Sequence, residues 1–312
     1  MVVTSRQKLK TRFDVWYCYK SGLGIEVARV APLLGSLVQR YTVSFESFHA
    51  SLYHPLKLIP KQISETNLTP PPSHPGHGDG IAFVCDKRIR GPFCDTKREK
   101  EAKKRGYLIV REDLGFPKIP LYEAAKRLAW KVCGKCKEVD FNILTPGVAH
   151  GTLILNLFGG SSLVKGLRTQ QQVERLLKAL HKLGDGLQFL VPVLPHQKGL
   201  VPANLPPRCP VRFVACGYLD PQLTVKVAGS PLIITVEGGM LHLAAAYRKP
   251  TICLLEKHWF DKVRDLLPPL ASFRPVIVPF DSTDFFPLVD ALASVLKKNK
   301  RNLQELGNQA IA

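Results

Sequence analysis

Apolar runs of strand length alternate with helical patterns along this chain, and this alternation restricts its fold more than any other feature. Residues 153–158 (LILNLF) form a largely apolar run of strand type, a glycine-serine turn follows, and apolar residues at helical spacing then cover residues 169–183. The same order returns in the apolar runs 232–236 and 251–255, with a glycine turn and a helical pattern between them. Short buried strands that alternate with helices predict a doubly wound parallel α/β sheet.

The first half of the chain repeats this arrangement. Residues 13–19 have a strand pattern, residues 21–24 a glycine turn, and residues 25–40 a helical pattern that leads into a second strand. A chain of 312 residues is long enough for two domains of ordinary size. We therefore expect an α/β protein with two domains, residues 1–148 and 149–312, whose last helix could cross back to the first domain.

The net charge of the chain limits the classes of partner that it is expected to bind. Lys and Arg number 44 against 25 Asp and Glu, which gives a formal net charge of +19. A strongly basic surface favours anionic partners such as nucleic acid, acidic lipid headgroups or phosphorylated sugars, and the charge alone does not choose among them. No apolar run reaches the roughly 18 residues that a membrane span needs, and the basic amino-terminus lacks a signal-peptide pattern. We expect a cytoplasmic protein.

Eight cysteines are present, and most lie in apolar runs typical of small buried residues. Only Cys133-Gly-Lys-Cys136 has the spacing of a metal-binding or redox pair. A zinc site would need a second pair of this kind, and the sequence contains none. We expect no metal, and the role of Cys133 and Cys136 stays open.

The glycine-serine turn after residues 153–158 is the first candidate binding segment. Ser161, Ser162 and Lys165 follow two glycines at the point where a strand should end. Hydroxyls, backbone N–H groups and a lysine can bind a phosphate there. The segment lacks the spacing of a P-loop, so a flexible turn with a surface lysine is the alternative.

A second candidate segment is Glu237-Gly238-Gly239-Met240-Leu241-His242, between a buried strand and a helix. Its glycines allow a tight turn, and a helix N-terminus offers N–H groups and a partial positive charge to a pyrophosphate. Glu237 could accept hydrogen bonds from sugar hydroxyls or serve as a helix cap. His242 could contact a ligand or be a buried core histidine.

The third candidate is Glu26, which follows the glycine turn of the first half at the start of a helix. A carboxylate there could act as a general base if it faced a cleft. It could equally stabilise the start of the helix.

These segments resemble a known family. Residues 239–251, Gly-Met-Leu-His-Leu-Ala-Ala-Ala-Tyr-Arg-Lys-Pro-Thr, are similar to the D-T-G-x-x-H-L-A-A-A-x-x-K-P-T segment of the ADP-heptose:lipopolysaccharide heptosyltransferases, glycosyltransferase family 9. Residues 161–165 resemble the S-x-x-K loop of that family, and residues 21–27 its S-x-G-D opening. The resemblance covers most of residues 150–280 and little of the first 145 residues.

The resemblance implies a GT-B fold, in which two Rossmann-like domains face each other across a cleft, and a metal-independent transfer that inverts the sugar. It implies that Ser161 or Ser162 and Lys165 bind the donor diphosphate. Glu237, Gly238, Gly239 and Met240 would hold the phosphates and sugar of the donor, with His242 nearby. Glu26 would replace the catalytic aspartate of the family.

The function implied is transfer of a sugar, heptose by family, from a nucleotide-diphosphate donor such as ADP-heptose to an acidic glycan or glycolipid of the lipopolysaccharide core. No separate cofactor and no nucleic acid are expected, and the basic surface allows peripheral contact with an anionic membrane. Two departures stand out: Glu237-Gly238 replaces Asp-Thr, and one extra residue separates Gly24 from the carboxylate of Glu26. A catalytically inactive relative and a basic nucleic-acid-binding α/β protein are therefore the alternatives.

Overall fold

The computed structural model forms two compact units, Met1–Thr145 and Pro146–Ala312. The expected domain boundary at residue 148 lies just inside the second unit. The structure describes residues 12–18, 23–54, 59–62, 79–85, 96–112, 121–134, 141, 144–158, 166–183, 187–205, 209–217, 221–256, 273–281 and 283–309.

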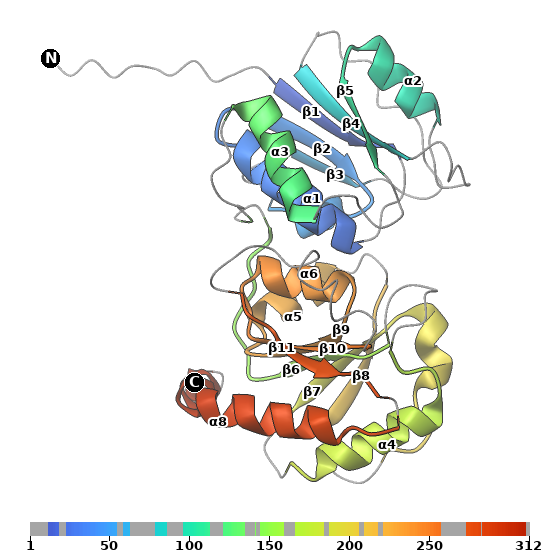
Figure 1. Cartoon of the computed structure of the whole chain (residues 1–312), viewed down its shortest axis with the longest axis vertical. Helices are drawn as coiled ribbons and strands as arrows, with labels where there is room; N and C mark the ends of the chain where they lie inside the picture. Colours follow the sequence, from blue (N-terminus) through green and yellow to red (C-terminus); the bar gives the residue numbers. More distant parts are fainter. Residues whose placement is uncertain are drawn as a thin grey trace, which may run out of the picture. The chain divides into compact units, whose positions relative to one another are not determined.

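The first unit contains a parallel five-stranded sheet in the order β3-β2-β1-β4-β5 (Figure 1). This is the strand order of a Rossmann-type sheet. Its strands are β1 (Arg12–Tyr17), β2 (Thr42–Ser47), β3 (Ile59–Gln62), β4 (Asp79–Cys85) and β5 (Leu108–Glu112). Its helices are α1 (Leu23–Leu37), the short 3-10 helix η1 (Ala50–Leu52), α2 (Thr96–Lys104) and α3 (Leu121–Cys133).

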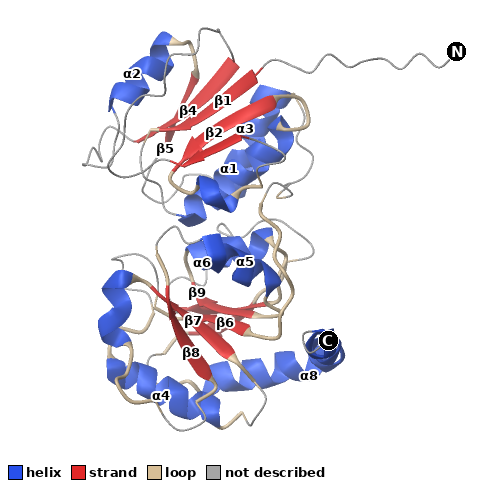
Figure 2. Cartoon of the chain, turned by 180° about the vertical axis from the view of Figure 1, so that it is seen from behind, coloured by secondary structure: helices blue, strands red, loops and turns tan. Residues whose placement is uncertain are grey.

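Helices cover both faces of this sheet (Figures 1 and 2). α1 and α3 pack against each other on one face, where Val15, Val43 and Phe45 are fully buried. α2 covers β4 and β5 on the other face. Because both faces are covered, the side chains of β1 and β2 are buried on both sides, apolar towards α1 and α3 and partly polar on the side of α2.

The second unit contains a six-stranded sheet in the order β11-β10-β9-β6-β7-β8, again parallel. Read from the β8 edge, this is the complete doubly wound order. Its strands are β6 (Leu153–Asn156), β7 (Phe189–Val193), β8 (Val211–Ala215), β9 (Ile233–Val236), β10 (Thr251–Leu255) and β11 (Val276–Pro279). Its helices are α4 (Gln170–His181), the 3-10 helix η3 (Pro195–Leu200), α5 (Pro221–Gly229), α6 (Gly239–Ala246) and α8 (Phe286–Gln309).

α4 and α8 pack on one face of this sheet, and α5 and α6 lie on the other (Figure 1). The core under α4 and α8 includes Leu155, Leu177, Ile234 and Leu292, each at most 3% exposed. The expectation of two Rossmann-like α/β domains is confirmed.

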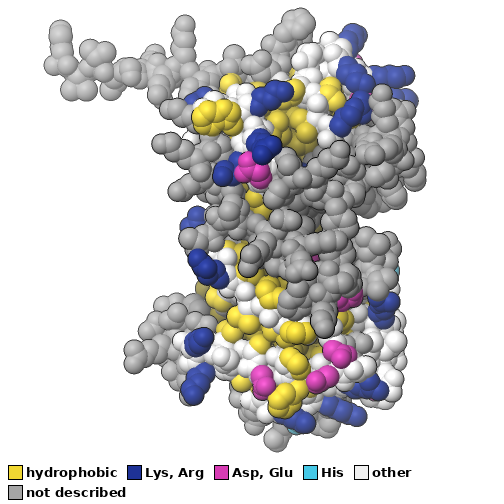
Figure 3. Space-filling view, in the orientation of Figure 1, with side chains coloured by type: hydrophobic (Ala, Val, Ile, Leu, Met, Phe, Trp, Pro, Cys, Tyr) yellow, Lys and Arg dark blue, Asp and Glu magenta, His cyan; other side chains and the backbone are white. Residues whose placement is uncertain are grey.

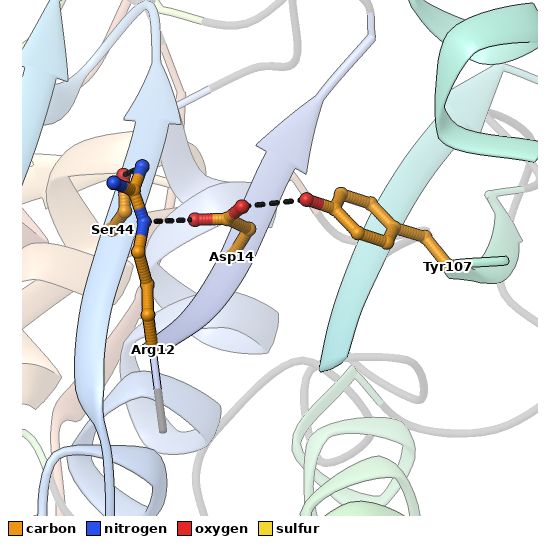
Figure 4. Close-up of polar contacts among 4 residues, drawn as sticks. All are labelled: Arg12, Asp14, Ser44 and Tyr107. Atoms are coloured by element: carbon orange, nitrogen blue, oxygen red, sulfur yellow. Dashed lines mark hydrogen bonds and ion pairs between the residues drawn. The ribbon is translucent and has the colours of Figure 1, made fainter. Parts of the chain in front are cut away.

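A buried polar cluster crosses the sheet of the first unit (Figure 4). Asp14 on β1 accepts a hydrogen bond from the Tyr107 hydroxyl at 2.5 Å and from Arg12 Nε at 2.9 Å, and Arg12 Nη2 donates to Ser44 Oγ. Tyr107 reaches Asp14 across β4 because the intervening residue is Gly80. A Cβ there would lie 2.6 Å from the Tyr107 ring.

The charged run of α2 contributes to the core as well as to the surface. Arg98 is 2% exposed, and its Nη2 donates to Glu46 Oε2 at 2.7 Å, while its guanidinium lies 5.2 Å from the centre of the Trp16 ring. Although most lysines of this run are exposed, Arg98 is therefore part of the core. Breaking a buried ion pair of this kind costs several kcal/mol because the remaining charge is left without its partner.

We expect Tyr107→Phe to lower the free energy of unfolding by about 1.5–3 kcal/mol, because it removes a buried hydrogen bond to a carboxylate. Burial and the hydrogen bond to Asp14 raise the pKa of Tyr107 from 10.0 to about 12. Folded Tyr107 therefore stays protonated where the unfolded side chain ionises, and this stabilisation is lost as the pH rises from 10 towards 12. Urea unfolding at pH 8 and at pH above 10 measures both effects. Equal stability of the two proteins at every pH would contradict the assignment.

α6 ends in a left-handed turn at Arg248. The Arg248 N–H bonds to the carbonyl of Ala245 and the Lys249 N–H to that of Ala244, and Arg248 has φ of 54°. This is a Schellman motif, in which glycine is usual at the left-handed position because a Cβ is disfavoured there.

Arg248→Gly should therefore raise the free energy of unfolding by about 1 kcal/mol, the cost of the left-handed conformation for a residue with a Cβ. Thermal unfolding measures the change. Lys249→Gly is the matched control, since its φ is not positive, and it should give no gain. A loss of stability in Arg248→Gly would show that the arginine side chain contributes more than the turn costs.

Candidate functional site

The strand order of the second unit reverses between β6 and β9. The connection after β6 leads to α4 on one face, and the connection after β9 leads to α6 on the other. In open parallel sheets, ligands bind in the crevice outside the carboxyl ends of the strands at such a reversal. The carboxyl ends of β6 and β9, at Asn156 and Val236, therefore define the candidate site.

The turn after β9 has the geometry of an anion-binding turn. Gly238 has φ of 154°, a value that residues with a side chain rarely adopt, and the space beside its Cα is open. Gly238 is also the N-cap of α6, and no side chain caps the helix there. The first N–H groups of an α-helix have no acceptor within the helix and carry its partial positive charge. This turn can therefore bind a phosphate through backbone groups.

The predicted residues of this segment differ in their exposure. Three residues that follow β9 are partly exposed at the carboxyl-terminal end of the sheet, namely Glu237, Gly238 and Gly239. Met240 is 7% exposed and His242 is 4% exposed, so both side chains pack within the unit. Of the two roles considered for His242, burial favours that of a core histidine.

A small hollow lies beside this turn at the carboxyl ends of β9 and β10. Glu237 and Glu256 line it, together with the backbone or side chains of Gly166, Val236, Leu254, Leu255 and Phe280. The hollow has a volume of about 10 Å³, which is room for one water molecule. Carboxylates are hydrogen-bond acceptors for hydroxyl groups such as those of a ribose or a sugar. The sequence analysis did not select Glu256. Its position directly after the apolar run 251–255 is the signal that would have found it.

The other predicted segment leaves from β6. The Leu167 N–H donates to the Leu157 carbonyl at 2.8 Å, so the two ends of this segment are joined at the carboxyl end of β6. Ser161, Ser162 and Lys165 lie outside the described residues. The structure therefore locates the ends of the segment beside the β9 turn and gives no contacts for these three side chains.

Asn156 is a further polar residue at the reversal of strand order that the sequence analysis missed. The Thr235 hydroxyl donates to the Val236 carbonyl at 2.8 Å, so Thr235 Oγ1 acts as acceptor for Asn156 Nδ2 at 3.1 Å. This arrangement fixes the orientation of the Asn156 amide and leaves its Oδ1 as a hydrogen-bond acceptor. Its position at the end of the run 153–156 is again the signal.

Glu26 lies in the first turn of α1 in the first unit and is 1% exposed. Its Oε1 accepts hydrogen bonds from Ser47 Oγ at 2.6 Å and from the Tyr53 hydroxyl at 3.3 Å. Ser47 Oγ in turn accepts from the His49 N–H at 2.8 Å. The carboxylate thus ties α1 to the chain that follows β2, and in this structure it does not face solvent.

No group of three or more His, Cys, Asp and Glu side chains able to hold a metal occurs within the described ranges. Cys133 is buried and Cys136 lies outside those ranges. The absence of a metal stays a prediction.

Several solved structures are similar to the whole chain. The E. coli heptosyltransferase WaaC, solved with ADP-2-deoxy-2-fluoro heptose, is 15% identical, with 92% of this chain and 99% of that chain covered and a TM-score of 0.54. A glycosyl transferase of family 9 from Veillonella parvula is 11% identical, with 95% and 98% covered and a TM-score of 0.54. A UDP-N-acetylglucosamine 2-epimerase from Listeria monocytogenes, described as putative, is 12% identical, with 95% and 90% covered and a TM-score of 0.50.

No family model matches the sequence, and no curated protein matches it either. At identities of 11–15% the structural likeness establishes the fold alone. The chain has the fold of the GT-B glycosyltransferases, with two Rossmann-like α/β domains.

Proposed function

We propose that this protein is a glycosyltransferase that uses a nucleotide-diphosphate sugar as donor. The observation that carries the proposal is the turn at Gly238, where a helix start without a side-chain cap lies at the reversal of strand order. Glu237 lies in this turn, and Glu256 follows the neighbouring strand β10. A phosphate-binding backbone next to acceptors for hydroxyl groups suits a molecule that carries both a diphosphate and sugars. The similarity to glycosyltransferases along nearly the whole chain supports the same reading.

In this proposal the donor binds to the second unit. The backbone at Gly238, Gly239 and Met240 holds the diphosphate, together with Ser161 or Ser162 and Lys165 from the segment after β6. Glu237 and Glu256 accept hydrogen bonds from hydroxyls of the ribose or the transferred sugar. Asn156 supplies one more acceptor at the same edge.

The reaction is a direct displacement at the anomeric carbon. An acceptor hydroxyl loses its proton to a base and forms the new glycosidic bond, while the bond to the nucleotide diphosphate breaks and the diphosphate leaves with the electron pair. Attack from the face opposite the leaving group inverts the configuration. The charge that develops on the diphosphate is stabilised by Lys165 and the N-terminus of α6.

Glu26 is the proposed base, and its burial sets a condition on that role. A general base has to come within hydrogen-bond distance of the hydroxyl that it deprotonates. Because Glu26 is 1% exposed and bound to Ser47 and Tyr53, acceptor binding would have to open this site. The same contacts also suit a purely structural carboxylate.

The transferred sugar is proposed to be heptose and the donor ADP-heptose. WaaC, which shares the fold, has been solved with ADP and with a fluorinated ADP-heptose. The formal charge of +19 favours an acidic acceptor, as in the lipopolysaccharide core.

A second candidate function follows from the burial of Glu26. A relative that binds a nucleotide sugar without transferring it would keep the turn at Gly238 and need no accessible base. The replacement of Asp-Thr by Glu237-Gly238 is in keeping with this alternative.

The first prediction of the proposed function concerns donor binding. ADP-heptose or another nucleotide diphosphate should stabilise the protein, by about 2.7 kcal/mol at one hundred times its Kd. Lys165→Ala should reduce this stabilisation because it removes a cation from the phosphate site. Lys182→Ala, which removes an exposed lysine at the end of α4, is the control and should respond as wild type does. Thermal shift measures all three proteins, and equal shifts in all of them would contradict the phosphate assignment.

Glu26→Gln tests the base. Gln preserves the shape of the side chain and can accept from Ser47, so the fold should remain, while transfer should fall by about 10²–10⁴-fold. Ser47→Ala is the matched variant, since it removes a contact of Glu26 and leaves the carboxylate. Its main effect should be a lower melting temperature. A loss of less than tenfold in Glu26→Gln, with transfer present in wild type, would remove Glu26 from the role. Donor binding without any transfer would favour the second candidate.

A further inference from the structure

The outer side of α3 combines an exposed tryptophan with charged residues. Trp130 is 62% exposed. Glu123, Lys126 and Arg127 precede it at helical spacing and surround the same shallow hollow. The opposite side of α3 is buried against the unit through Tyr122, Ala125, Ala129 and Cys133, each at most 3% exposed. α3 therefore packs with one side only, and its outer side carries the large aromatic ring.

An exposed tryptophan is unusual in this part of the chain. Within the described part of the first unit, Trp130 is the large hydrophobic side chain that stands exposed, whereas Trp16 is 2% exposed. The indole ring is apolar over most of its surface and carries one N–H, so it suits an interface between water and an apolar phase.

Cations dominate the surroundings of Trp130. The side chain of Arg127 is 64% exposed and that of Lys126 is 33% exposed, and Lys131 is exposed on the next turn. Arg40 is also exposed and donates through Nη1 to the Cys133 carbonyl at the end of α3. Glu123 offsets part of this charge, at 3.0 Å from Arg127 and 4.0 Å from Lys126. Figure 3 shows Lys and Arg side chains on this face of the first unit, with hydrophobic and acidic side chains beside them.

We propose that this outer side of α3 is a docking surface for an anionic lipid bilayer. Trp130 enters the headgroup region, and Arg40, Lys126, Arg127 and Lys131 contact anionic headgroups. Binding of this kind is peripheral and combines a small apolar insertion with charge attraction. In keeping with it, none of the helices that the structure describes is long and apolar enough to cross a membrane.

Two features favour a bilayer over other anionic partners. The apolar part is a single ring beside Glu123, Lys126 and Lys131, whereas Lys and Glu are depleted in protein interfaces. α2 shows what charge alone looks like in the same unit: Lys97, Lys100 and Lys104 are exposed there without an exposed aromatic residue. A comparison of the two helices can therefore distinguish a lipid contact that depends on Trp130 from general attraction of a basic protein to anionic lipid.

The test is co-sedimentation of the full chain with phosphatidylcholine vesicles that contain or lack phosphatidylglycerol. We expect binding to the anionic vesicles only. Trp130→Ala should weaken it by roughly tenfold, since most of a large apolar side chain is no longer buried. Trp130→Phe should retain most of the affinity. Lys126→Gln together with Arg127→Gln should weaken binding by about fivefold for each charge removed.

Lys100→Gln together with Lys104→Gln on α2 is the matched control, because it removes the same charge from another exposed helix of the same unit. Its affinity should stay close to that of wild type. An equal loss in both double variants, or no effect of Trp130→Ala, would show that net charge alone attracts the vesicles. A monomer–dimer change in size-exclusion chromatography that depends on Trp130 without vesicles would show that a second copy occupies this surface. Neither outcome depends on a donor or on transfer, so the proposed function is tested separately.

Discussion

The parallel pairing of β6 with β9 organises the second unit. Asn156 lies opposite Thr235 in this register, and Ile154 and Leu155 lie opposite Ile233 and Ile234. The connections that follow these two strands lead to helices on opposite faces of the sheet. At such a reversal no connection crosses over the carboxyl ends of the two strands, where the turn at Gly238 is partly exposed. The turn at Gly238 and Glu237 directly follow β9 and depend on this pairing, whereas Glu256 follows β10.

The two units have the same type of strand order, but the candidate carboxylates of the two units differ in their exposure to solvent. Glu237 is partly exposed beside an open turn, while Glu26 is enclosed by Ser47 and Tyr53. The Glu237 side chain keeps part of its surface in contact with solvent, although its Oε2 atom is buried. A buried carboxylate is held by hydrogen bonds whose loss has to be offset before it can bind anything else. In the proposed reaction, the first unit would therefore have to rearrange before Glu26 could take part.

The fold could be predicted because the strands of a doubly covered sheet are continuous apolar runs, and residues 153–156, 233–236 and 251–255 have this pattern. β3 could not, since Ile59–Gln62 is a short edge strand that contains a proline and two polar residues. The turn at Gly238 could be predicted from its glycines. The burial of Glu26 could not, because it depends on Ser47 and Tyr53, which are 21 and 27 residues away in the sequence. The burial of Arg98 could not be predicted either, because its partner Glu46 lies 52 residues away in the sequence.

The hydrogen bond from Leu167 to the Leu157 carbonyl has a consequence for how such a protein can change. It holds the two ends of the segment between these residues together at the carboxyl end of β6. Lengthening a closed loop adds little free energy, about 0.6 kcal/mol for each doubling. In the proposed site, a change of length between the two residues is therefore expected to cost little stability while β6 and α4 stay in place. The segment between Leu157 and Leu167 is thus a place where the proposed ligand preference could change in evolution while the strands and helices of the sheet stay the same.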